Sequence, residues 1–187
     1  MKKNFGQKTW FFPLPVLIIG TYDEKSVPNA MNAAWGGITD YNMVELNLDP
    51  SHKTCENINL NKEFTVAFAT KETMVKSDYV GMVSGNKVND KVAKAGLTPV
   101  KAEFVNAPRF DEYPVTLECK VLKLEYVPDG LRVVGEILNV VADEAVLTDG
   151  NIDVLKLNAL AYDPVNHSYY TVTNVVGKAF NEGKKLM

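Results

Sequence analysis

The stretch PVTLECKVLKLEYV, residues 114–127, decides the fold. Its apolar residues first occupy alternate positions, and then continue in the opposite phase: Val115, Leu117, Cys119 and Val121, followed by Leu122, Leu124 and Tyr126. Alternation is typical of a strand that buries one face. A flat strand cannot change phase and keep one face buried, whereas a bulge or a sharp bend permits it. The stretch therefore predicts one long, bent β-strand.

Further strands surround this one along the chain. LRVVGEILNVVAD, residues 131–143, is apolar in both phases, as expected of a strand covered on two sides, and PDG at 128–130 supplies the turn. Other strands are expected at 15–22, 29–38 (ended by the glycines at 36 and 37), 43–49, 63–70 and 168–174. Short helices are expected after an N-cap at Ser51, at 72–83 with an apolar stripe (Val75, Tyr79, Met82, Val83), at 89–96, and as a helix or tail from 176. The pattern predicts a mainly β protein with short helices, a closed or nearly closed antiparallel barrel in a single domain over residues 1–187.

Composition excludes several classes of protein. The chain has 187 residues, of which 46% are hydrophobic, as is ordinary for a globular protein. Its net charge of -3 argues against nucleic acid as a partner, because the phosphate backbone attracts basic surfaces. No apolar run reaches the length of a membrane helix, and the N-terminal apolar segment is interpreted as the first strand rather than a signal peptide. Cys55 and Cys119 are expected to be buried thiols, which favours the cytoplasm. Without paired Cys/His clusters no metal site is expected, and His167 is interpreted as a turn residue.

The run PNAMNAAWGG, residues 28–37, is almost free of charge. Its asparagines carry donors and acceptors, while its alanines and glycines let a ligand approach the backbone closely. A heteroaromatic ring with a polar edge needs this combination. The alternative is a tightly packed strand with capping amides.

The run SHKT, residues 51–54, lies at the expected start of a helix. A helix N-terminus offers unpaired N–H groups and a partial positive charge, and two hydroxyls and a lysine beside it would hold a phosphate. The alternative is a simple helix cap with a solvated lysine. Together, the two runs suit a cofactor with a flat ring and a phosphate.

The order of motifs resembles a known family. P-N-A-M-N-A-A-W at 28–35 is followed by D-P-S-H-K-T-x-x-N-I at 49–58, EFTVAFAT at 63–70 and VSG…VNDKVAKAGL at 83–97. This order is similar to the flavin reductase-like, FMN-binding split-barrel family, in particular its flavoredoxin-type members, over roughly residues 10–185. The resemblance implies a homodimeric, Greek-key-like split barrel with FMN near the dimer interface. The implied cofactor-binding residues are Asn29, Met31, Asn32, Ala33, Ala34, Trp35, Ser51, His52, Lys53, Thr54, Asn57, Ser84, Gly85 and Lys91.

Two functions follow from the resemblance. The first is an oxidoreductase that moves electrons from NAD(P)H through FMN to a small acceptor such as free flavin or a ferric complex. Hydride transfer to a flavin needs no protein acid or base, so no catalytic residue is assigned. The alternative is an electron carrier that receives electrons from a partner protein and has no nicotinamide site. A barrel that has lost its flavin is a further alternative. Trp10, Phe11 and Phe12 are expected in the core or at a dimer contact.

Overall fold

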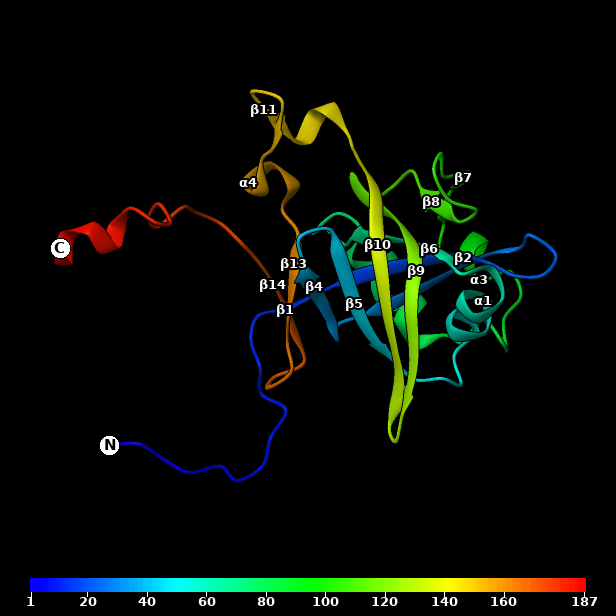
Figure 1. The fold of residues 1–187 in the computed structure, drawn as a ribbon, viewed down its shortest axis with the longest axis horizontal. Helices are drawn as coiled ribbons and strands as arrows, with labels where there is room; N and C mark the ends of the chain where they lie inside the picture. The colour runs from blue at the N-terminus through cyan, green and yellow to red at the C-terminus, as the bar shows by residue number, and fades with distance from the viewer.

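The computed structural model describes residues 1–187. The main body of the protein is a seven-stranded antiparallel sheet. Its strands follow the order β3-β2-β6-β9-β10-β5-β4 (Figure 1). Their bounds are β2 Leu17–Tyr22, β3 Pro28–Ala33, β4 Gly36–Asp40, β5 Met43–Leu48, β6 Glu63–Phe68, β9 Val115–Val127 and β10 Gly130–Ala142. The predicted mainly β, antiparallel architecture with short helices is confirmed.

One extended segment supplies both edges of this sheet. β3 pairs with β2 on one side, and β4, which follows after Ala34 and Trp35, pairs with β5 on the other. The Asn47 N–H donates to the Trp35 carbonyl at 2.8 Å, which continues the ladder through the crossover. The prediction that a strand stops at Gly36 and Gly37 is therefore wrong, because these glycines begin β4. The crossover places residues 28–37 at the seam of the barrel.

The predicted irregularity of the long strand is confirmed. Lys123 pairs with Val134 and Val121 pairs with Gly135, so Leu122 is an extra residue in β9. This bulge lies where the apolar phase changes. Leu122 and Tyr126 remain exposed, because the β9–β10 hairpin extends past the end of the barrel, as Figure 1 shows.

Two hydrophobic clusters lie on opposite faces of β2, β3 and β6. The barrel interior holds Leu17, Ile19, Phe64, Val66, Leu117, Leu131 and Val133, with Cys55 and Ile58 of the first helix. The outer face holds Val16, Ile18, Ala30, Ala67, Val80 and Phe110. Burial on both faces explains the continuous apolar run of β2. Both cysteines are buried free thiols.

Short helices and 3-10 turns lie between the strands, and the last of them lies in the C-terminal segment. They are α1 Lys53–Asn61, α2 Met74–Met82, α3 Lys91–Lys94, α4 Val154–Leu157, and the 3-10 turns η1 Glu144–Val146 and η2 Glu182–Leu186. The prediction of Ser51 as an N-cap is wrong: His52 occupies that position, because the Ser51 hydroxyl donates to Asp49 Oδ1 at 2.7 Å. No helix is long and apolar enough to cross a membrane.

The apolar stripe predicted on residues 72–83 is not the packed face of α2. Val75 is 77% exposed and Met82 is 79% exposed, whereas Ser77 and Val80 are buried. Helix α2 approaches β3 through Gly81, where an added Cβ would lie 3.0 Å from the Asn32 Cβ. The close approach of α2 to β3 selects the small-residue face, so Val75 and Met82 of the stripe are left exposed, whereas Tyr79 packs partly against the outer cluster.

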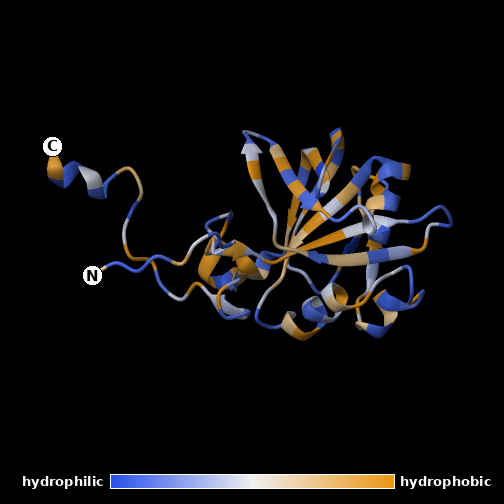
Figure 2. Ribbon diagram, turned by 90° about the horizontal axis from the view of Figure 1, so that it is seen from below, coloured by the Kyte–Doolittle hydropathy of each residue, from blue (hydrophilic) through white to orange (hydrophobic).

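A second sheet, three-stranded, lies beside the barrel seam. It consists of β1 Leu14–Pro15, β13 Leu160–Asp163 and β14 Ser168–Thr171, and two small hairpins (β7 Pro99–Lys101 with β8 Pro108–Phe110, β11 Leu147–Thr148 with β12 Asn151–Ile152) complete the strands. The chain before β1 and after β14 forms two extended arms. Figure 2 shows that both arms run away from the body on the same side.

Candidate functional site

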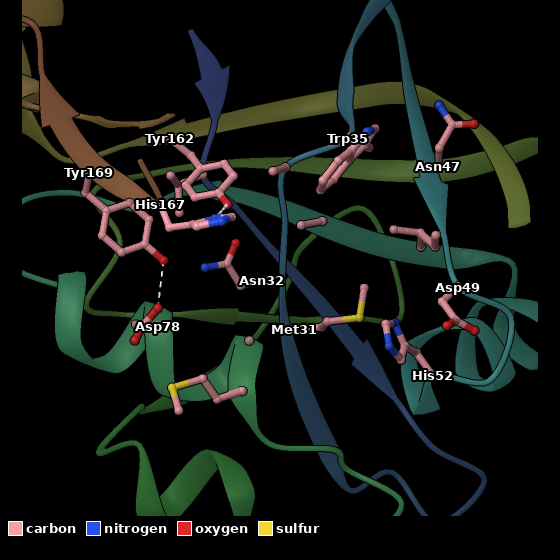
Figure 3. A pocket seen from close by; sticks show the side chains of 16 residues that line it. Met31, Asn32, Trp35, Asn47, Asp49, His52, Asp78, Tyr162, His167 and Tyr169 are labelled. Carbon is pink, nitrogen blue, oxygen red and sulfur yellow. Dashed lines mark hydrogen bonds between the residues drawn. The ribbon is translucent and has the colours of Figure 1, made fainter. Parts of the chain in front are cut away.

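A large chamber of about 530 Å³ opens at the barrel seam. Its walls come from β3, the crossover, the end of β5, α2 and the β13–β14 hairpin (Figure 3). The residues that line the chamber are Val16, Met31, Asn32, Ala33, Ala34, Trp35, Asn47, Leu48, Asp49, His52, Asp78, Gly81, Met82, Tyr162, His167 and Tyr169. Aliphatic, aromatic and amide groups are combined with few charges, which is the chemistry of a site for a flat organic ring.

A narrow cavity of about 130 Å³ adjoins this chamber. The two spaces share five lining residues, namely Met31, Asn32, His52, Gly81 and Met82. The narrow cavity continues past the start of α1 to the loop after α2, and its further walls are Asn29, Lys53, Thr54, Val80, Val83, Ser84, Gly85 and Lys91. A more open polar cavity of about 360 Å³ follows, walled in part by Asn29, Lys53, Gly85 and Lys91.

The start of α1 offers donors to the narrow cavity. The N–H groups of Lys53 and Thr54 have no acceptor among the backbone and side-chain hydrogen bonds of the chain. Such free N–H groups, together with the helix dipole, favour an anion. The Lys53 ammonium, by contrast, is already 3.2 Å from Glu56 Oε2. The backbone of the SHKT run is therefore the more available part of it.

Lys91 is the free cation of the narrow cavity. The residue is only 4% exposed, and its ammonium has no hydrogen-bond or ion-pair partner within the chain. Burial lowers the pKa of Lys91 to about 8. The largely buried lysine has no counterion, although its ammonium keeps some contact with solvent through the open polar cavity, so an anionic ligand would be favourable at this position.

A buried hydrogen bond joins the two sequence runs. Asn29 Nδ2 on β3 donates to Thr54 Oγ1 on α1 at 2.9 Å. Gly85 packs against this pair: an added Cβ would lie 2.5 Å from Asn29 Oδ1 and 3.2 Å from the Lys53 Cβ. The loop after α2, β3 and α1 thus meet at one point beside Lys91.

Two hydrogen-bonded pairs lie on the other side of the chamber (Figure 3). The Tyr162 hydroxyl is 2.7 Å from His167 Nδ1, and the Tyr169 hydroxyl donates to Asp78 Oδ1 at 2.7 Å. Burial and the bond to Asp78 raise the pKa of Tyr169 to about 12. Tyr169 is therefore a neutral phenol at physiological pH.

All but two of the residues expected to bind a cofactor line the chamber or the narrow cavity. The exceptions are Ser51, held by Asp49, and Asn57, which is buried and donates to Thr21 Oγ1 at 3.0 Å. Sequence reasoning missed the walls that come from other elements, above all Asp78, Tyr162, His167 and Tyr169. His167 does lie in the β13–β14 turn, with φ +53°, and it also lines the chamber. The tyrosine-rich hairpin YDPVNHSYY, residues 162–170, was the available signal.

Comparison with known proteins agrees with this geometry. The chain is similar to the crystallised flavoredoxin of Desulfovibrio vulgaris (Miyazaki F), with 35% identity and a TM-score of 0.93 over 98% of this chain and 100% of that one. It is also similar to the flavoredoxin of Methanosarcina acetivorans, with 31% identity and a TM-score of 0.92 over 100% of both chains.

A curated relative of uncharacterised function, from Aquifex aeolicus (strain VF5), is 35% identical over 134 residues. The match covers 70% of this chain but only 63% of that relative, less than two thirds of its length. The model of the protein family described as "Flavin reductase like domain" matches residues 9–164 of this chain. These residues include the barrel, the seam and all of the chamber's lining except His167 and Tyr169, and the chain therefore belongs to the flavin reductase-like domain family.

Proposed function

We propose that the chain is an FMN-binding oxidoreductase, a single flavin-binding unit that moves electrons from NAD(P)H through FMN to a small acceptor. The observation that carries the proposal is the adjacency of two spaces. The unpaired ammonium of the largely buried Lys91 borders a narrow cavity, and that cavity shares a wall with a chamber suited to a flat ring. The similarity to flavoredoxins and the flavin reductase-like domain supports the same cofactor.

The residues present fit FMN at both ends. The phosphate would be held by Lys91, by the free N–H groups of Lys53 and Thr54, and by the Ser84 hydroxyl, all of which border the narrow cavity. The ring would lie in the chamber against the segment from Met31 to Trp35. Bound FMN supplies hydride and electron transfer, and the protein's share is to orient it and to shield one side from water.

Asn57 and Ser51 would act indirectly in this account. Asn57 fixes α1 against β2 through Thr21, and Ser51 shapes the turn before α1 through Asp49. Both positions therefore support the start of α1 rather than contact the cofactor.

A homodimer is part of the proposal. Val176 is 94% exposed and Phe180 is 99% exposed on the C-terminal arm, and Phe11 on the N-terminal arm is exposed as well. Met82 of α2, which is also exposed, lines the chamber. Apolar groups that remain this exposed in one chain favour an intermolecular contact. Because β1 and β14 lead into the arms, a second copy would meet this one beside the chamber.

The alternative function is an electron carrier without a nicotinamide site. It is favoured by the high similarity to the two flavoredoxins over nearly the whole chain. The experiment that separates the two functions mixes FMN-loaded protein with NADH or NADPH in the absence of oxygen. Rapid loss of the flavin's visible absorbance supports the oxidoreductase. If the yellow colour persists and only a protein reductant removes it, the carrier is correct.

A further inference from the structure

Tyr162 and His167 form a pair that the binding of FMN does not require. Both residues line the large chamber and neither borders the narrow cavity, so they lie at the end of the site away from Lys91. His167 is exposed to solvent, whereas Tyr162 is half-buried. The pair therefore connects bulk water to the chamber over one hydrogen bond of 2.7 Å.

The pair is not needed to hold the β13–β14 turn. The Asp163 carboxylate already ties that turn, because it accepts hydrogen bonds from the Val165 N–H at 2.7 Å and from Asn166 Nδ2 at 2.9 Å. The turn sets His167 at φ +53°, a left-handed conformation in which histidine, like asparagine and aspartate, is enriched among the non-glycine residues. This conformation places the imidazole against the Tyr162 phenol at the edge of the chamber.

Among the hydroxyls of this cluster, that of Tyr162 can direct its hydrogen to a ligand while it stays bonded to His167. The Tyr169 hydroxyl is committed to Asp78, and the Asn32 amide donates to the Ser77 carbonyl at 3.1 Å. When His167 carries its proton on Nδ1, it donates to the Tyr162 oxygen, and the Tyr162 O–H then points elsewhere. The rings of Tyr162 and Tyr169 are 6.0 Å apart and inclined by 53°, which forms an aromatic wall beside this donor.

We propose that Tyr162 is a proton donor to a small quinone-type acceptor bound in the chamber, and that His167 relays the proton from solvent. The inference rests on the proposed flavin-dependent function. The acceptor receives a hydride from reduced FMN at one oxygen and a proton from the Tyr162 hydroxyl at the other, which leaves a hydroquinone and oxidised FMN. The Tyr162 oxygen recovers a proton from His167, and His167 recovers one from water. Reduction of a ferric complex, which takes single electrons, needs no such donor.

The test uses FMN-loaded protein that has been reduced with dithionite and is then mixed, without oxygen, with either tetramethyl-1,4-benzoquinone or ferricyanide. The variants are Tyr162→Phe and His167→Asn, since asparagine tolerates a positive φ. Tyr170→Phe is the matched control, because Tyr170 is a neighbouring tyrosine of β14 that packs on Phe12 and does not line the chamber. FMN content and thermal unfolding are measured first for every variant.

We expect Tyr162→Phe to slow quinone reduction roughly 100-fold and His167→Asn roughly 10-fold, in the range of general acid catalysis. Ferricyanide reduction should stay unchanged, and so should both rates of the control. Quinone reduction by the wild-type protein should slow in D₂O, and this isotope effect should vanish in Tyr162→Phe. Tetramethylhydroquinone should bind oxidised, FMN-loaded Tyr162→Phe roughly 3- to 10-fold more weakly, as expected for one lost hydrogen bond.

Equal quinone rates and equal hydroquinone affinities in the wild type and in Tyr162→Phe would overturn the proposal. So would a parallel loss with both acceptors, which would mean that Tyr162 serves the cofactor. If the wild-type protein reduces ferricyanide but reduces the quinone no faster than free reduced FMN, the acceptor class is wrong while the flavoprotein stands. If the wild-type protein takes up no FMN, the proposed function itself fails, and this proposal fails with it.

Discussion

Asn29 on β3 donates a buried hydrogen bond of 2.9 Å to Thr54 on α1. This bond ties the uncharged run at the barrel seam to the start of α1, where we propose that the phosphate binds. The fold thereby places two segments that are separated in the sequence at a fixed distance, as a cofactor with a ring and a phosphate requires.

Breaking this bond should weaken cofactor binding. For Asn29→Ala and Thr54→Val we expect the Kd for FMN to rise roughly tenfold and the free energy of unfolding to fall by about 1–3 kcal/mol, because each change leaves a buried polar partner. Fluorescence titration with FMN and urea unfolding check both values.

The matched control is a second buried pair of the same chemistry, Asn57 and Thr21, with a bond of 3.0 Å outside both cavities. Asn57→Ala and Thr21→Val should destabilise the fold by a similar amount but raise the Kd for FMN much less than the changes at Asn29 and Thr54, because this pair supports α1 without bordering either cavity. A tenfold loss of affinity in these variants as well would mean that general destabilisation, not the position of Asn29, governs binding.

Lys91→Met should separate binding from stability. The variant removes a charge-assisted contact to the phosphate, so the Kd for FMN should rise roughly 10- to 100-fold. It also removes an unpaired cation whose pKa is lowered by burial, so the free protein should become more stable, by about 1 kcal/mol at most. Lys94→Met is the control, because Lys94 is exposed and paired with Asp90 at 3.0 Å. A Lys91→Met protein that binds FMN with wild-type affinity would exclude Lys91 from the phosphate site.

The affinity for FMN should depend on pH through Lys91. Because burial lowers the pKa of Lys91 to about 8 from an ordinary value near 10.5, the ammonium loses its proton in the free protein above pH 8. The Kd of the wild-type protein should therefore rise as pH increases above 8, whereas the Kd of Lys91→Met should stay level. Titrations between about pH 7 and 9, where the phosphate remains a dianion, measure this difference.

Stability has the opposite dependence on pH. Between about pH 8 and 10.5 the unfolded chain keeps a proton on Lys91 that the folded chain releases, so the free energy of unfolding should rise with pH in this window. The rise should be smaller in Lys91→Met. Identical pH profiles for the two proteins would contradict an ammonium that is buried without a partner.

Removal of the C-terminal arm tests the dimer. A chain that ends at Thr171 lacks the exposed apolar residues Val176 and Phe180, so we expect its dimer to dissociate at concentrations at which the full chain is dimeric. Analytical ultracentrifugation measures both. A full chain that sediments as a monomer, or a truncated chain that stays dimeric, would show that the arm does not hold two copies together.

Local patterns predicted the parts of the fold that depend on local chemistry. The phase change at Leu122 predicted a bulge or bend, and β9 has a bulge there. The small residues at 28–37 were expected to let a ligand approach the backbone, and five residues of this run line the chamber. Serine is a good helix cap, so the sequence predicts that Ser51 caps α1. In the structure the Ser51 hydroxyl donates to Asp49 instead, and His52 occupies the cap position. The apolar stripe of α2 predicts that Val75 and Met82 pack against the body. In the structure these two residues are exposed, and Ser77 and Val80 are buried in their place.

The rest of the site depends on contacts between distant segments. β13 is a strand of four residues, and its pairing with β1 brings Tyr162 to the chamber from more than a hundred residues beyond Met31. Asp78 reaches the same chamber because Gly81 lets α2 approach β3 closely. Neither placement has a local sequence signal, since both follow from the three-dimensional packing.

Titration of the FMN-free protein with FMN tests the central claim most directly. Flavin fluorescence and visible absorbance should report one FMN for each chain, with a Kd of about 1 µM or tighter, and Lys91→Met should weaken this binding. A wild-type protein that folds but leaves the spectrum of FMN unchanged up to about 100 µM would contradict the account.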